Sequence, residues 1–70
     1  MLARVIWIDS KNSEFIKVQF DTECTAKIEL LGAEVNINDI LEGNFTNSGD
    51  EKIFNKTQNQ DIDVYIQDFD

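Results

Sequence analysis

The sequence contains no histidine and no proline, and its single cysteine is Cys24. Without histidine, neither a Ser-His nor a Cys-His catalytic pair can form, and no mixed cysteine–histidine zinc site is possible. One cysteine also excludes an internal disulfide bond, and we expect Cys24 to be a small apolar residue at the start of a strand. These absences favour a protein that is not an enzyme, with no catalytic residue and no cofactor.

Basic residues are scarce, since six lysines and arginines stand against fourteen aspartates and glutamates, for a formal net charge of −8. This charge opposes the counterion release that supplies most non-specific affinity for nucleic acid. The acidic residues are spread along the chain, as is typical of the solvated surface of a small domain. We therefore expect nucleic-acid binding to be weak or absent.

Long apolar runs are missing as well. Apolar residues make up 41% of the chain, but they occur in short runs, whereas a membrane span needs about 20 consecutive residues. Residues 1–9 have neither the apolar stretch nor the small-residue cleavage site of a signal peptide. Seventy residues suffice for one core. We expect a single cytoplasmic domain over residues 1–70, without membrane contact.

Alternation of apolar and polar residues is the dominant pattern, and it predicts strands separated by turns rich in Asp, Asn, Ser and Gly. No long segment has the 3.6-residue period of a helix, and a short helical turn at residues 31–34 is the most helix we expect. Gly43, inside one of the segments, predicts a bend or a close backbone approach. The expected strands are residues 3–8, 15–20, 24–30, 40–46, 51–57 and 61–67.

A closed barrel accommodates so many short strands in one small domain, because closure removes exposed edges and alternate side chains fill the interior. The expected class is mainly β, a small five-stranded closed barrel of OB-like or SH3-like type, with six strands if every segment forms its own. The apolar phase of each segment predicts the core. Its expected members are Val5, Ile16, Val18, Ile28, Leu30, Leu41, Phe45, Ile62, Val64 and Ile66.

Two segments resemble OB-fold families. Residues 5–9, 10–12 and 13–16 read V-I-W-I-D, S-K-N and S-E-F-I, which resembles the opening of a cold-shock domain, with its V-K-W-F-N strand, basic turn and G-F-G-F-I strand. Residues 35–45 resemble the strand entry of S1-type barrels, where Asp precedes the strand and Gly lies within it. The resemblance implies an OB barrel whose outer aromatic residues stack on nucleic-acid bases.

The residues that carry this function in the family are mostly replaced here. Trp7 and Phe15 keep aromatic positions, but the first aromatic of G-F-G-F-I falls at Ser13 or Glu14, and Ile6 replaces the lysine before the tryptophan. The family's V-F-V-H reads A-K-I-E at residues 26–29. The resemblance therefore implies the fold more than nucleic-acid binding, because one fold serves many functions.

Two charged groupings offer further chemistry. Asp61, Asp63, Asp68 and Asp70 cluster near the C-terminus, but they lack the spacing of a calcium loop, and we expect solvated carboxylates and no metal. Lysines and an aromatic residue alternate at Lys52, Phe54 and Lys56. These three side chains form either a small anion-facing patch or ordinary lysine packing over the barrel.

The candidate partner-binding residues are Trp7, Phe15, Lys17 and Gln19. We expect Trp7 and Phe15 on the outer face of the first two strands, as cross-strand neighbours, with Lys17 and Gln19 continuing that face as a polar margin. A tryptophan in such a setting is a typical binding hot spot. The leading hypothesis is a protein-binding module that acts through this patch or a strand edge. The alternatives are weak binding of single-stranded RNA or DNA, and an acidic mimic of nucleic acid that occupies a basic cleft.

Overall fold

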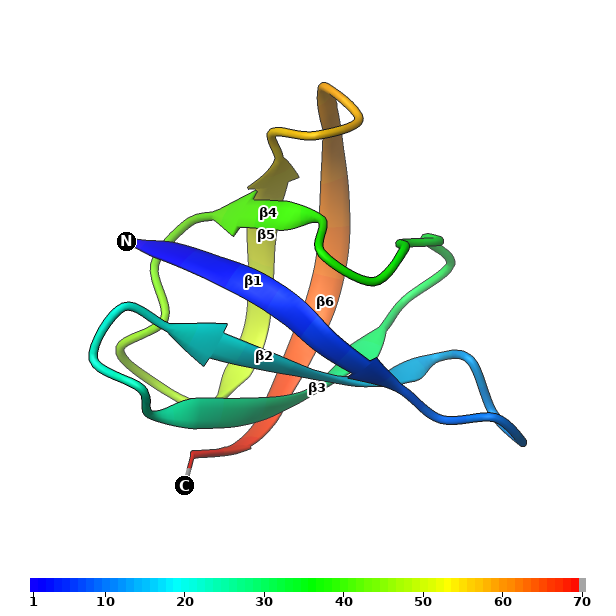
Figure 1. Cartoon of the computed structure of the whole chain (residues 1–70), viewed down its shortest axis with the longest axis horizontal. Helices are drawn as coiled ribbons and strands as arrows, with labels where there is room; N and C mark the ends of the chain where they lie inside the picture. The colour runs from blue at the N-terminus through cyan, green and yellow to red at the C-terminus, as the bar shows by residue number, and fades with distance from the viewer. Residues whose placement is uncertain (70) are drawn as a thin grey trace.

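Two three-stranded meanders join edge to edge to form the molecule. The computed structural model describes residues 1–69, and it contains six strands and no helix in that range. The barrel is closed in the order β1-β2-β3-β6-β5-β4, and all its strand pairs are antiparallel. Figure 1 shows β1, β2 and β3 running across the view, with β5 and β6 crossing behind them. The strands are β1 (Leu2–Ile8), β2 (Phe15–Phe20), β3 (Thr25–Leu30), β4 (Ile40–Glu42), β5 (Gly49–Asn55) and β6 (Gln60–Phe69).

The expected closed β-barrel is confirmed, and it has six strands. Closure of the barrel pairs every strand with two neighbours, which limits the strand-edge mode of binding that was expected as an alternative to the aromatic patch. Its closure is uneven, since β5 pairs with β6 along its whole length but with β4 only through Phe54 and Asn55. Among residues 1–69, no helix is long and apolar enough to cross a membrane.

Strand boundaries differ from expectation where turns take up residues. Cys24 is exposed, and its expected place at the start of a strand is wrong, because the turn after β2 closes with hydrogen bonds from the Phe20 N–H to the Cys24 carbonyl and from the Glu23 N–H to the Phe20 carbonyl. The strand expected at residues 40–46 ends at Glu42. The helical turn expected at residues 31–34 is instead part of an irregular connection.

Gly43 fulfils the close approach predicted for it. A Cβ atom at this position would lie 2.5 Å from Cγ2 of Ile53 and 3.4 Å from its Cα. Only glycine lets the backbone after β4 pass so close to β5. The chain can therefore turn from the short β4 into the loop that leads to β5.

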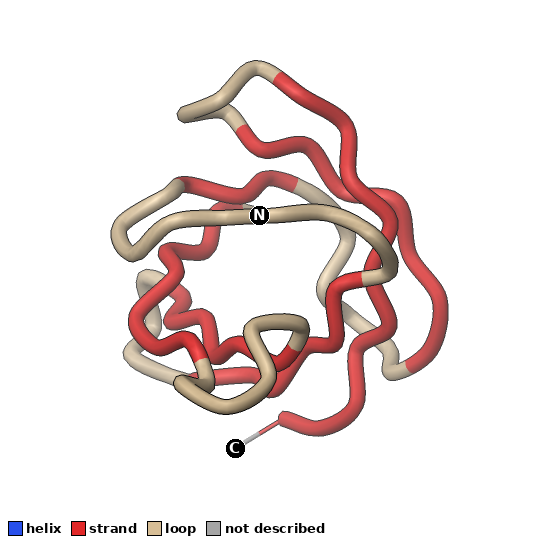
Figure 2. The backbone as a smooth tube through the Cα atoms, turned by 90° about the vertical axis from the view of Figure 1, so that its right-hand side faces the viewer, coloured by secondary structure: helices blue, strands red, loops and turns tan. Residues whose placement is uncertain are grey.

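The core is the set of inward side chains of all six strands and two connections. All ten residues predicted for the core are at most 4% exposed. Figure 2 shows the backbone encircling this central region, which the core side chains fill. The rings of Phe20 and Phe45 meet edge to face, with centroids 5.2 Å apart. The core also contains five buried residues that the prediction did not include: Ala3, Phe20, Ala26, Val35 and Ile53.

A buried carboxylate fastens the long connection between β3 and β4 to the end of β5. Oδ2 of Asp39 accepts hydrogen bonds from the Asn36 N–H at 3.0 Å, from Nδ2 of Asn55 at 3.0 Å and from Nε2 of Gln58 at 2.7 Å. Asp39 is 4% exposed and Asn55 is fully buried. Burial raises the pKa of Asp39, but these hydrogen bonds outweigh it and hold the pKa below the ordinary aspartate value.

Candidate functional site

Trp7 faces outward because β1 contains a β-bulge. Ala3 and Val5 point into the core, so strict alternation would also bury Trp7. The register, however, runs from Val5 opposite Val18 directly to Trp7 opposite Lys17, which leaves Ile6 as the extra residue. The bulge reverses the phase of the strand. Trp7 is consequently 40% exposed, as expected for a partner-binding residue, and Ile8 packs against the core instead.

Phe15, Lys17 and Gln19 occupy alternate positions of β2 and share the outer side of the barrel with Trp7. All three side chains are half-buried. Trp7 and Phe15 lie on neighbouring strands, as expected, and they are diagonal neighbours because Trp7 lies directly opposite Lys17. The structure thus brings the four predicted residues onto one outer face of β1 and β2.

Each of the two aromatic rings lies beside a lysine ammonium group. Nζ of Lys17 is 5.6 Å from the centroid of the Trp7 ring, and Nζ of Lys27 is 5.9 Å from that of Phe15. Both distances are within the range of cation–π attraction. Lys27 was not among the predicted site residues, although its outward phase in the third strand was visible in the sequence. We call Trp7, Phe15, Lys17, Gln19 and Lys27 the cation–aromatic face.

Charge is distributed unequally between the two meanders. Residues 1–30 contain four of the six basic residues and five of the acidic ones, whereas residues 31–70 contain two basic and nine acidic residues. The net charge of −8 is therefore concentrated in the second half of the chain. The cation–aromatic face lies on the half that is close to neutral.

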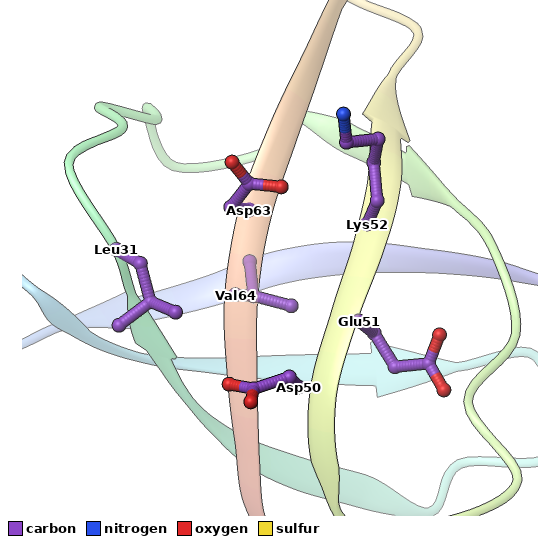
Figure 3. Close-up of a pocket in the computed structure, with 6 residues that line it drawn as sticks. All are labelled: Leu31, Asp50, Glu51, Lys52, Asp63 and Val64. Atoms are coloured by element: carbon purple, nitrogen blue, oxygen red, sulfur yellow. The ribbon is translucent and has the colours of Figure 1, made fainter.

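The second charged grouping lies on the other meander, in different surroundings. Lys52 is opposite Asp63 and Phe54 is opposite Asp61, while Lys56 lies beyond the end of β5, so the three expected residues do not share one strand. The adjoining hollow has a volume of about 450 Å³. Among the lining side chains drawn in Figure 3, carboxylates outnumber the one lysine. These surroundings do not favour an anion. The hollow is lined by Leu31, Asp50, Glu51, Lys52, Asp63 and Val64.

The C-terminal carboxylates form no recognisable metal centre in the part of the chain that the structure describes. Asp61 and Asp63 are exposed on β6, and Asp68 is near its end, while Asp70 lies outside the described residues. Within residues 1–69, no three His, Cys, Asp or Glu side chains gather in a way that could hold a metal ion.

Comparisons with known proteins do not assign this chain to a family. No protein-family model matches the sequence, no curated protein resembles it significantly, and no solved structure matches the fold at a significant level. The function must therefore be argued from the geometry and chemistry of the cation–aromatic face.

Proposed function

We propose that this protein is a non-catalytic binding module whose cation–aromatic face docks on another protein. The observation that carries the proposal is the outward projection of Trp7 from the bulge in β1, beside Lys17. Tryptophan is enriched among the residues that dominate binding energy at protein interfaces, where a polar margin excludes water from the centre. Lys17 and Gln19 supply such a margin.

The scaffold suits this role because it holds the face rigidly. β2 and β3 are hydrogen-bonded to a strand on both sides, and β1 is paired with β2 and, at Leu2–Arg4, with β4. The inward side chains of the same strands are packed in the core. A preorganised surface loses little conformational entropy on binding. The proposal extends to a cytoplasmic location. It also extends to kinship with cold-shock domains, supported by the motif at residues 5–16, and with S1-like OB domains, supported by residues 35–45.

Single-stranded nucleic acid is the second candidate ligand, because lysines beside aromatic rings also form base-stacking platforms. Two observations favour a protein instead. The net charge is −8, and Glu29 lies directly opposite Phe15. The nine acidic residues of the second half favour the third hypothesis, an acidic mimic, which requires carboxylates in rows about as regular as backbone phosphates.

Affinity capture from native lysate tests the proposal, with nuclease treatment to remove partners that bind through RNA or DNA. Trp7→Ala should abolish capture while moving the unfolding midpoint little. Leu31→Ala is the matched control, since Leu31 is 46% exposed, comparable to Trp7 at 40%, and lies beside β6. Capture that survives Trp7→Ala, or that Leu31→Ala removes equally, would contradict the assignment of this face.

A further inference from the structure

Two lysines face each other directly across β2 and β3. Lys17 and Lys27 are paired in the register of these strands, so their Cβ atoms are separated by about 5 Å. Like charges at directly opposed positions destabilise a sheet. In a chain with fourteen acidic residues and only six basic ones, this arrangement departs from what stability alone would select, and such departures concentrate at functional sites.

The nearby carboxylates do not neutralise the two lysines. Oε1 of Glu29 accepts a hydrogen bond from Nε2 of Gln67 at 3.2 Å, and Oδ1 of Asp68 accepts one from the Phe69 N–H at 3.1 Å. Asp68 lies opposite Lys27 in the register, yet within residues 1–69 neither ammonium group is at ion-pair distance from a carboxylate. The contacts of both ammonium groups in this range are with aromatic rings.

We propose that the space between the ammonium groups of Lys17 and Lys27 is an anion subsite that receives a carboxylate side chain from an acidic, extended segment of the partner protein. This inference rests on the proposed function and names the chemistry of the partner. One carboxylate can accept hydrogen bonds from both ammonium groups, because its two oxygens offer about four lone-pair positions. Its charge removes the repulsion between the lysines, and apolar side chains of the same segment pack on Trp7 and Phe15.

A peptide carboxylate fits this face better than a phosphodiester backbone. Lys17 and Lys27, with Arg4 opposite Gln19, form a small positive region on a chain whose second half is strongly acidic, whereas a nucleic-acid strand brings a charge with every nucleotide and draws its affinity from many neutralised phosphates. A peptide can place one carboxylate between the lysines and neutral side chains elsewhere. Charge complementarity is thus satisfied locally.

Trp7 provides the assay, because it is the only tryptophan and Lys17 lies over its ring. The probe is a tryptophan-free decapeptide in which glutamate alternates with phenylalanine and glycine, titrated into the full chain at low ionic strength. We expect a saturable change in Trp7 emission. Lys17→Gln and Lys27→Gln should each weaken binding about tenfold, as expected for loss of a charge-assisted hydrogen bond. A peptide with glutamine in place of glutamate should bind weakly, and with about the same affinity, to wild type and to both lysine variants.

Lys52→Gln is the matched control, since it removes the same charge from an exposed strand position on β5, and it should leave the affinity unchanged. If Lys52→Gln weakens binding as much as Lys17→Gln and Lys27→Gln do, the effect is one of net charge and the subsite is overturned. The subsite is also overturned if the glutamine peptide binds as tightly as the glutamate peptide, or if no saturable binding occurs up to about 1 mM peptide. Tighter, lysine-dependent binding of a ten-nucleotide thymidine strand would overturn the choice of a protein ligand. Trp7→Ala lacks the fluorophore, so its peptide binding is measured by isothermal titration calorimetry beside wild type and the lysine variants. If Trp7→Ala weakens peptide binding while both lysine variants bind normally, the proposed face stands and the anion subsite fails.

Discussion

Replacing Asp39 with alanine should remove a large part of the stability of this small barrel. A 70-residue domain has a free energy of unfolding of about 4–10 kcal/mol. The substitution removes the acceptor of three hydrogen-bond donors. These donors are the Asn36 N–H, Asn55 Nδ2 and Gln58 Nε2. Asn36 and Gln58 are exposed and can turn to water, but Asn55 is fully buried.

The magnitude follows from these environments. An unsatisfied buried donor costs about 1–3 kcal/mol, and each hydrogen bond exchanged for water costs about 1 kcal/mol, while relief from burying a charge offsets part of the loss. We expect Asp39→Ala to lower the free energy of unfolding by about 2–4 kcal/mol in urea denaturation followed by Trp7 fluorescence. Asp9→Ala is the control, because Asp9 accepts one exposed N–H bond, from Lys11 at 2.9 Å, and should lose less than about 1 kcal/mol.

The same carboxylate predicts a pH dependence. Because the pKa of Asp39 is lower in the folded protein than its ordinary value, its contribution is fully present above the pKa of the unfolded chain, about 3.9, and is lost as the pH falls through the folded value. The stability difference between wild type and Asp39→Ala should therefore narrow below about pH 4. A variant as stable as wild type at pH 7, or a difference that is constant from pH 7 to pH 2.5, would refute this reasoning.

Three further predictions concern the core, the β4 exit and nucleic acid. Ile28→Ala should lower the free energy of unfolding by about 2–5 kcal/mol because Ile28 is fully buried, and a denaturation curve matching wild type would contradict its place in the core. Gly43→Ala should lower it by about 1–3 kcal/mol, since the new methyl group meets Ile53; unchanged thermal stability would show that the loop yields freely. Fluorescence anisotropy with mixed-sequence single strands should find only weak, salt-sensitive association, whereas sub-micromolar affinity at about 150 mM salt would make nucleic acid the leading ligand.

The core and most strands could be predicted because the alternation of apolar and polar residues along a strand directly reflects which side chains are buried. β2 has the predicted boundaries, and every predicted core residue is buried. The position of Trp7 depended on something that the pattern does not contain. Alternation from Val5 places Trp7 inside, and only the extra residue Ile6 in the register with β2 places it outside. A bulge depends on pairing between strands, so no local pattern of apolar residues specifies it.

Lys27 and Asp39 were missed for different reasons. The outward phase of Lys27 was evident, but its contact with Phe15 follows from the register between β2 and β3, which the sequence does not state. Asp39 was recognised only as the aspartate that precedes the strand in the S1-like motif, and its burial was not predicted. Its burial depends on Asn55 and Gln58, which are 16 and 19 residues away, and long-range polar networks leave no periodic signature.

The closure of the barrel depends on a short pairing between β4 and β5. Two residue pairs, Leu41 with Asn55 and Glu42 with Phe54, close it. A hydrogen bond from the Lys56 N–H to the Ile40 carbonyl and the hydrogen bonds of Asp39 to the Asn55 and Gln58 side chains lie at the same junction. Local opening follows the region with the fewest backbone bonds to break. The first local opening to expose interior backbone should therefore separate β4 from β5. The β1–β2–β3 meander that carries the cation–aromatic face should keep its shape, so local opening of the barrel should not disturb a bound partner.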